Sequence, residues 1–118
     1  MSDFPTYRDL EVVKNDYPDR DYNISIEVPE FNCVCPKTGL PDFANIKISY
    51  VPDKDIVELK SLKLYMVGFR NLGIYHEHVT NQILDDLVKI LSPKKISIIG
   101  DFHPRGGVKT AVKAEWEK

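Results

Sequence analysis

Alternating apolar and polar residues predict four β-strands along the chain. Between Tyr22 and Val28 every second residue is apolar, and the same period of two returns between Asn45 and Val51. A period of two is typical of a strand that buries one face. Pro29 suggests the end of the first strand, which should pair antiparallel with the second across a long loop. The four expected strands cover residues 21–31, 45–51, 96–102 and 108–116, with a bend at Gly106-Gly107.

A spacing of three or four residues between apolar positions predicts two helices in the middle of the chain. Asp55 with Glu58 three residues later has the form of a capping box, so the first helix is expected to begin at Asp55 and to run to Gly73. The second is expected to begin near Tyr75 and to stop at Ser92-Pro93. The order ββααββ predicts an α+β fold, with two helices on one face of a four-stranded antiparallel sheet.

The length and charge of the chain limit its possible domain organisation and partners. A chain of 118 residues with a formal net charge of −2 is expected to form a single domain, residues 1–118, without a bulk electrostatic preference for nucleic acid or membranes. Residues 1–20 show no clear period and are expected to form an irregular arm. No apolar run approaches the roughly 18 residues that cross a bilayer, and the amino end lacks a secretory pattern. Two cysteines one residue apart suit reduced thiols, so a cytoplasmic protein is expected.

The segment from Phe31 to Ala44 contains the residues that most need a chemical explanation. Two prolines and a glycine disfavour regular structure, so a loop is expected that presents Cys35 and Asp42 on one irregular surface. A cysteine near a carboxyl group can act as a nucleophile with a proton donor. The residue types alone favour a less specific interpretation, in which Cys35 packs inside the protein and Asp42 caps a turn.

Metal binding and a Rossmann cofactor site are both poorly supported. The pair Cys33-x-Cys35 with His76-x-His78 is a weak zinc motif, because structural zinc sites usually space their cysteines by two to four residues. We therefore expect no metal. Cys33 is interpreted as structural, although in an extended segment it could point the same way as Cys35. No Gly-x-Gly-x-x-Gly turn follows a strand.

Several motifs occur together in a characteristic order and spacing. They are Cys35-Pro36-Lys37-Thr38-Gly39-Leu40-Pro41-Asp42-Phe43-Ala44, Glu58-Leu59-Lys60-Ser61-Leu62-Lys63-Leu64-Tyr65, Phe69-Arg70-Asn71 and His76-Glu77. From about Phe31 to Gly107 the chain closely resembles the short, single-module branch of the QueF family. These oxidoreductases are NADPH-dependent 7-cyano-7-deazaguanine reductases of queuosine biosynthesis, a tRNA modification pathway. The octapeptide from Glu58 to Tyr65 is the most specific motif, since every position complies with the family pattern.

The resemblance implies a reaction and its catalytic residues. In the family, the cysteine that matches Cys35 attacks the nitrile to form a covalent thioimide, and the aspartate that matches Asp42 donates a proton. Two NADPH molecules then supply hydride in turn, so that 7-cyano-7-deazaguanine becomes 7-aminomethyl-7-deazaguanine. The imine formed on the way must stay enclosed, because water would hydrolyse it.

The resemblance also implies binding residues. A carboxylate can accept two hydrogens from the edge of a guanine-like base, which suits Glu77. The implied substrate-binding residues are Val57, Glu58, Leu59, His76 and Glu77. The cations expected to bind the phosphates of NADPH are Lys60, Lys63 and Arg105. The residue types alone also permit solvated lysines on a helix face, a solvated His76, and a Glu77 that interacts with the helix dipole.

The family adopts the tunnelling fold, or T-fold, in which subunits join their sheets edge to edge into a ring-shaped barrel and rings can stack. We therefore expect a homo-oligomer with active sites between subunits. Such an assembly would also cover the two open edges of a four-stranded sheet.

Two other functions stay open at this point. QueF-like amidinotransferases keep the thioimide and add ammonia to deazaguanine-containing tRNA, but they lack the NADPH octapeptide. A noncatalytic purine-binding module with the same fold would tolerate loss of Cys35, whereas a reductase would not. Oxidation of NADPH that depends on the nitrile substrate separates the reductase from both.

Overall fold

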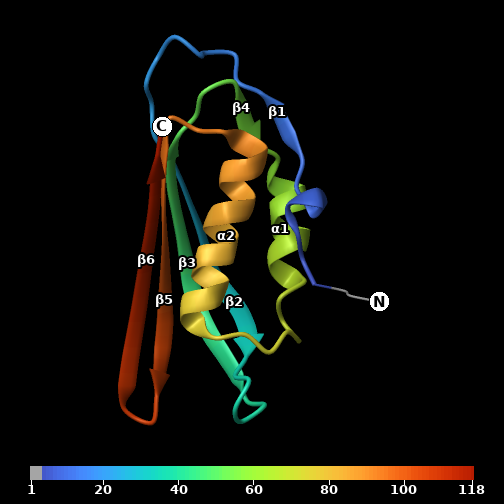
Figure 1. Ribbon diagram of the computed structural model, residues 1–118, viewed down its shortest axis with the longest axis vertical. Coiled ribbons are helices and arrows are strands. Elements are labelled where there is room, and N and C mark those ends of the chain that lie inside the picture. Colours follow the sequence, from blue (N-terminus) through green and yellow to red (C-terminus); the bar gives the residue numbers. More distant parts are fainter. Residues whose placement is uncertain (1–3) are drawn as a thin grey trace.

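The computed structural model describes residues 4–118. Its elements, in chain order, are η1 (Tyr7–Asp9), β1 (Val12–Lys14), β2 (Ile24–Val34), β3 (Pro41–Val51), β4 (Asp55–Val57), α1 (Leu59–Val67), α2 (His76–Leu91), β5 (Lys95–Arg105) and β6 (Val108–Glu117). Both α-helices run alongside the long strands, and the loop before β3 lies at the same end of the molecule as the start of α2 (Figure 1).

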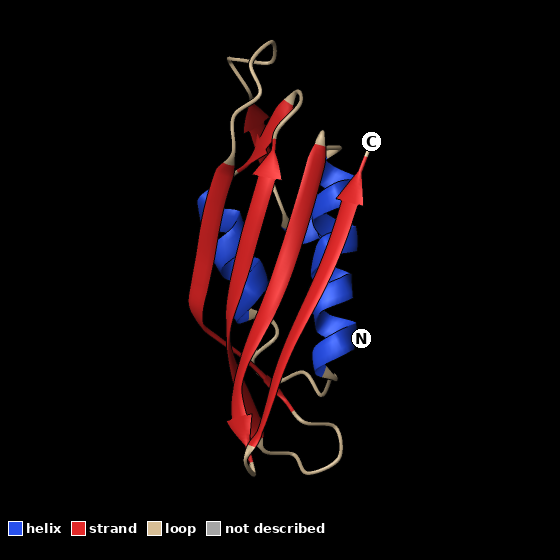
Figure 2. Cartoon of the chain, turned by 90° about the vertical axis from the view of Figure 1, so that its left-hand side faces the viewer, coloured by secondary structure: helices blue, strands red, loops and turns tan. Residues whose placement is uncertain are grey.

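The four long strands form one antiparallel sheet in the order β2-β3-β5-β6. Ile48 on β3 is paired with Ile26 on β2 and with Ile98 on β5. Both α-helices cover the same face of this sheet (Figure 2). The α+β class and the ββααββ order of the main elements are therefore confirmed, while β1 and β4 form a separate two-stranded sheet that the sequence pattern did not reveal.

The core lies between the sheet and the helices. Every second residue of β3 and β5 is buried, and the apolar stripe of α2 faces the same space. Full burial of a large aliphatic side chain contributes about 1.5–3 kcal/mol relative to exposure. Central members of this core are Ile46, Ile48, Tyr50, Ile96, Ile98, Val79, Ile83 and Leu87.

The expected long loop from Phe31 to Ala44 is much shorter in the structure. Strand β2 does not end at Pro29 but continues to Val34, and β3 already begins at Pro41. The pairing shifts between Val28 and Phe31, where β2 has one more residue than β3. Such a bulge tolerates a proline on an edge strand, because the extra residue needs no partner in the ladder. The true loop is residues 35–40.

Strand β5 also contains a bulge that the sequence pattern did not reveal. The expected third strand ended at Phe102, whereas β5 continues to Arg105 and its pairing with β6 shifts between these two residues. In a regular strand, residues 102 and 104 would share one face of the sheet and residue 105 would lie on the other. The extra residue shifts this alternation of faces by one position. With it, Arg105 follows Phe102 onto the helix-covered side of the sheet.

The first helix is shorter than the expected span from Asp55 to Gly73, and the predicted capping box is wrong. Residues Asp55–Val57 form β4, and α1 spans Leu59–Val67. The N-cap is Glu58, whose carboxylate accepts hydrogen bonds from the N–H groups of Lys60, at 2.8 Å, and Ser61, at 2.7 Å. The three preceding residues have a competing partner in β1, and the β-branched Ile56 and Val57 suit a strand.

The amino-terminal arm is more ordered than expected. Residues 1–3 lie outside the described part of the chain, but η1 and β1 lie within it. Asn15 is buried, with its side chain donating to the carbonyl of Asp53 at 2.7 Å and accepting from the Tyr22 hydroxyl at 2.7 Å. These contacts tie the arm to the turn before β4 and to the segment before β2.

The second helix matches its prediction closely. It spans His76–Leu91 and ends at Ser92, which adopts a left-handed conformation with φ of 43° before Pro93. Across residues 4–118, neither this helix nor α1 has the length and apolar character needed to cross a membrane.

Candidate active site

Cys35 lies on a short, hydrogen-bonded loop between β2 and β3. Its N–H donates to the carbonyl of Leu40 at 2.8 Å, and its carbonyl accepts from the N–H of Gly39 at 2.9 Å. Gly39 has φ of 74°, a conformation that glycine adopts without a steric penalty. These bonds fold the Pro-Lys-Thr-Gly sequence back on itself and leave the partly exposed Cys35 at its base.

The loop also makes Cys35 the more acidic of the two thiols. Hydrogen bonds from the Thr38 hydroxyl and from the N–H groups of Thr38 and Lys37 lower the pKa of the Cys35 thiol, outweighing partial desolvation and the negative charge of Asp42. A lower pKa increases the fraction of thiolate, which is the nucleophilic form.

Cys33 has the opposite environment. It is fully buried, and its sulfur lies 3.9 Å from the carbonyl oxygen of Ile74. Burial, reinforced by the charge of Asp42 and by Cys35, raises the pKa of the Cys33 thiol to about 12. The two cysteines therefore differ in both access and acidity.

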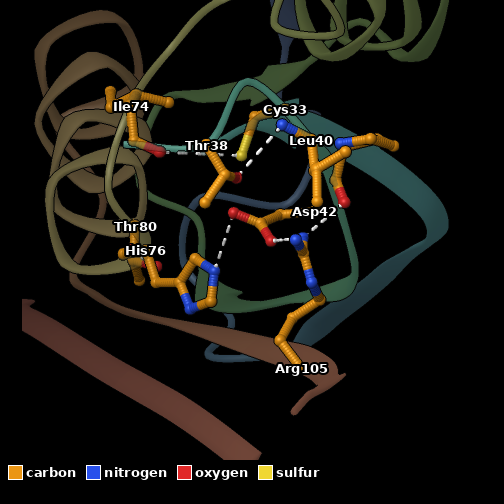
Figure 3. A network of polar contacts seen from close by, with 9 residues as sticks. Cys33, Thr38, Leu40, Asp42, Ile74, His76, Thr80 and Arg105 are labelled. Atoms are coloured by element: carbon orange, nitrogen blue, oxygen red, sulfur yellow. Dashed lines mark hydrogen bonds and ion pairs between the residues drawn. The ribbon is translucent and has the colours of Figure 1, made fainter. Parts of the chain in front are cut away.

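Asp42 is a buried carboxylate held from two sides. Only 5% of the residue is exposed. One carboxylate oxygen lies 3.1 Å from Nε2 of His76, and the other accepts a hydrogen bond from the guanidinium of Arg105. Figure 3 shows Asp42 between these two side chains, with Cys33 and Thr38 nearby. Three elements meet here, since Asp42 is the second residue of β3, His76 begins α2 and Arg105 ends β5.

His76 is oriented by contacts on both its ring and its backbone. Its ring stacks on that of Phe102, with 3.7 Å between centroids and 5° between planes. Its carbonyl accepts a hydrogen bond from the Thr80 hydroxyl at 2.8 Å. The segment before α2 is fixed to the end of β2, because Val34 exchanges backbone hydrogen bonds with Leu72 and Ile74. This pairing brings the start of α2 next to the Cys35 loop.

The expected substrate-binding residues fall into two groups that are far apart within one chain. His76 and the exposed Glu77 lie at the start of α2, beside Asp42. The other group lies where β4 meets α1, at the opposite end of the molecule (Figure 1): Val57 ends β4, Leu59 begins α1, and Glu58 lies between them. The nine residues of α1 alone span about 13 Å. One small base therefore cannot contact both groups of a single chain.

The expected cofactor cations are also divided. Lys60 and Lys63 are exposed on α1, whereas Arg105 contacts Asp42. Lys63 lies on the rim of a groove of about 470 Å³ between α1 and β2. The groove is largely apolar, with Arg70 as a second cation, and further lining residues include Val28, Phe31, Leu59, Met66 and Val67. Two carboxylates, Glu27 and Glu30, also line the groove, so Lys63 and Arg70 are the groups there that suit an anionic phosphate, and the apolar floor suits flat rings.

Within residues 4–118, no three metal-ligating side chains gather closely enough to hold a metal ion. In the weak zinc motif formed by Cys33-x-Cys35 and His76-x-His78, the side chains lie in different environments, because Cys33 is buried whereas His78 is exposed.

Comparison with known proteins identifies the family of this chain. A family model described as "QueF-like protein" matches residues 41–118. A protein of Thermomicrobium roseum named "NADPH-dependent 7-cyano-7-deazaguanine reductase" is 58% identical over 111 residues, which cover 94% of this chain and 87% of that protein. A protein of Alkalilimnicola ehrlichii with the same name is 52% identical over 118 residues, which cover 100% of this chain and 91% of that protein. The chain belongs to the QueF family.

A solved structure shows the same fold. The apo crystal structure of the archaeosine synthase QueF-Like superposes with a TM-score of 0.73 at 19% identity, covering 79% of this chain and 91% of that one. At this identity the likeness concerns the fold alone. Together with the sheet order, it places this QueF member in the T-fold class.

Two residues of this QueF site were not singled out from the sequence. Thr38 donates to the Cys35 sulfur, and Phe102 stacks on His76. Thr38 lies within the Pro-Lys-Thr-Gly motif, so its position was a usable signal. Phe102 had no such signal, because a buried aromatic residue in a strand usually indicates only core packing.

Proposed function

We propose that this QueF chain reduces 7-cyano-7-deazaguanine to 7-aminomethyl-7-deazaguanine with NADPH, and thereby serves queuosine biosynthesis. The observation that supports this most is a buried Asp42 carboxylate beside a loop thiol of lowered pKa, in a chain more than half identical to relatives that carry this activity in their names. We further propose that residues 1–118 act as one reductase domain.

The first step is addition of Cys35 to the nitrile. The sulfur forms a bond to the nitrile carbon, one π-bond of the C≡N group opens, and the nitrogen takes a proton to give a thioimide. No electrons are gained or lost overall. Arg105 and His76 hold the carboxyl group of Asp42 from two sides, close to the Cys35 loop. Asp42 is therefore suited to accept the thiol proton of Cys35 and to return it to the nitrogen.

Reduction requires protons and exclusion of water. NADPH, when bound, supplies the hydride for each of two successive reductions. The first reduction ends with release of Cys35 from carbon and leaves an imine, and the second gives the amine. The first reduction consumes a proton that ends on the released sulfur of Cys35, and the second adds a proton at nitrogen. Asp42 and His76 can deliver these protons from one side of the site.

We propose that each site is shared between two copies of the chain. Glu77 would accept the hydrogens on the guanine-like edge of the substrate, next to Cys35 and Asp42. The segment Val57–Leu59 would come from a second copy, since within one chain it lies beyond the far end of α1. Such a homo-oligomer would also cover the edges that β2 and β6 present in the single chain.

We assign Lys60 and Lys63 to the phosphates of NADPH. Both are exposed on α1, and Lys63 borders the groove between α1 and β2. The groove is also lined by Asn32, three residues before Cys35, so a ligand along it would extend towards the thiol.

The test is NADPH absorbance in the presence of purified protein and 7-cyano-7-deazaguanine. The reductase oxidises two NADPH per nitrile, loses activity in Cys35→Ala and keeps it in Cys33→Ala. Absence of NADPH oxidation by the assembled, reduced wild-type protein would contradict the proposal. Incorporation of ammonia into a nitrile-containing substrate would then favour amidine formation, and substrate binding without reaction would favour a purine-binding module.

A further inference from the structure

Arg105 contacts the catalytic carboxylate rather than projecting freely from the molecule. One terminal nitrogen of its guanidinium donates to the carbonyl of Pro41 at 2.6 Å and to the carboxylate of Asp42. Both acceptors lie in the first two residues of β3. The same guanidinium nitrogen therefore fixes the start of this strand and the side chain that begins the proton transfer.

The β5 bulge is what makes this contact possible. Register shifts between Phe102 and Arg105, so the extra residue brings Arg105 to the helix-covered face on which Phe102 already lies. Phe102 there supports the ring of His76, and Arg105 reaches Asp42. Arg105 thus holds one oxygen of Asp42 directly, while Phe102 supports His76 at the other oxygen through stacking.

A buried carboxylate needs such partners. Without a cation or hydrogen-bond donor, burial strongly disfavours its ionised form. His76 covers one oxygen and Arg105 the other. Loss of Arg105 would leave one oxygen without its partner and would free the side chain to rotate away from Cys35.

We infer that Arg105 is a positioning residue for Asp42 in the addition of Cys35 to the nitrile, and that this is its main contribution rather than binding of the cofactor phosphate. The inference rests on the proposed function. It differs from the expectation drawn from the sequence, which placed Arg105 with Lys60 and Lys63. Addition requires no NADPH, so the two roles of Arg105 affect different steps.

The experiment measures adduct formation without NADPH. Wild-type protein is mixed with 7-cyano-7-deazaguanine, and the rate at which the intact mass increases by one substrate is followed by mass spectrometry. In Arg105→Gln we expect this rate to fall by about tenfold or more, while the KM for NADPH in the full reaction stays within about twofold of wild type because no phosphate contact is lost. Lys63→Gln is the matched control, with unchanged adduct formation and a raised KM for NADPH.

Two further measurements separate positioning from a general structural effect. In a Cys35→Ala background, Arg105→Gln should bind the nitrile substrate with unchanged affinity by calorimetry. With Cys35 intact, Arg105→Lys should recover part of the adduct rate, since lysine restores a cation without the planar fork of arginine. Added guanidinium ion should likewise recover part of the adduct rate of Arg105→Ala.

Each remaining outcome overturns a specific claim. Unchanged adduct formation in Arg105→Gln, with a raised KM for NADPH, would return Arg105 to the cofactor site. Loss of substrate affinity in the Cys35→Ala background, or absence of any rescue by Arg105→Lys and by guanidinium, would reduce Arg105 to a structural residue. Absence of an adduct in the wild-type protein would instead contradict the proposed function itself.

Discussion

The acidity of Cys35 depends on a few atoms of its own loop. The Thr38 hydroxyl and two N–H groups donate to its sulfur and lower the pKa of the thiol. The lowered pKa means that the thiolate is present at a lower pH than in an ordinary cysteine. Removal of a donor should therefore move the appearance of thiolate to higher pH.

Thr38→Val tests this at the level of one atom. The substitution removes the hydroxyl but keeps the shape of the side chain, so we expect the midpoint of the pH profile for alkylation by iodoacetamide to rise. Reduction of the nitrile at neutral pH should slow in parallel. An unchanged profile in Thr38→Val would show that the backbone N–H groups alone set the pKa.

Cys33 provides the control for that measurement. It is buried and its pKa is raised to about 12, so it should contribute no alkylation in the folded protein. Cys33→Ala should thus reproduce the wild-type profile, whereas Cys35→Ala should eliminate the reaction until the protein unfolds.

At the level of elements, the sheet and α2 approach each other closely at Gly100. A Cβ placed there would lie 2.5 Å from Oγ1 of Thr80 on α2 and 2.9 Å from the Phe102 ring. Thr80 donates to the carbonyl of His76, and Phe102 stacks on its ring. The absence of a side chain at Gly100 therefore lets β5 and the first turn of α2 hold His76 between them.

We expect Gly100→Ala to lower the free energy of unfolding by about 1–3 kcal/mol, as overpacking does, and to reduce the rate of nitrile reduction by displacing His76. Urea denaturation and steady-state kinetics would measure the two effects. Gly73→Ala is the matched control, because a Cβ there would meet only the Pro36 Cα, at an ordinary 3.7 Å. Equal stability of the two variants would contradict the tight approach of β5 to α2.

For the whole molecule, the separation of the two proposed substrate-binding groups is the feature with the largest consequence. Cys35, Asp42 and Glu77 lie at one end, and Val57–Leu59 lie at the other (Figure 1). A site assembled from two copies predicts that two inactive variants can restore each other. Cys35→Ala disables one group, and Leu59→Arg should disable the other without disturbing the core, since Leu59 is 61% exposed.

Coexpression of these two variants with different tags, followed by tandem purification, should give mixed oligomers that regain measurable NADPH oxidation. Each variant purified alone should be inactive. The pair Cys35→Ala and Asp42→Asn should stay inactive when mixed, because both changes affect the same group. Inactive mixed oligomers of the first pair would mean that one chain forms the site alone.

The sequence by itself determined the features that depend on local periods and motifs. Alternation along β3 and β5 and the stripe of α2 reflect how a strand or helix buries one face, so the class and order of these elements were predictable. The resemblance to QueF, drawn from the Cys35 loop and the octapeptide, was confirmed by the family comparison.

Only the tertiary structure decided where the extra residues of β2 and β5 fall, because a bulge exists relative to a partner strand and leaves no period in its own sequence. It also decided that Asp55–Val57 pair with β1 instead of joining α1, since a local helix signal competes there with a distant partner. The contact between Arg105 and Asp42 has the same origin. Residues 63 positions apart meet through the pairing of β3, β5 and β6, and no local pattern records that distance.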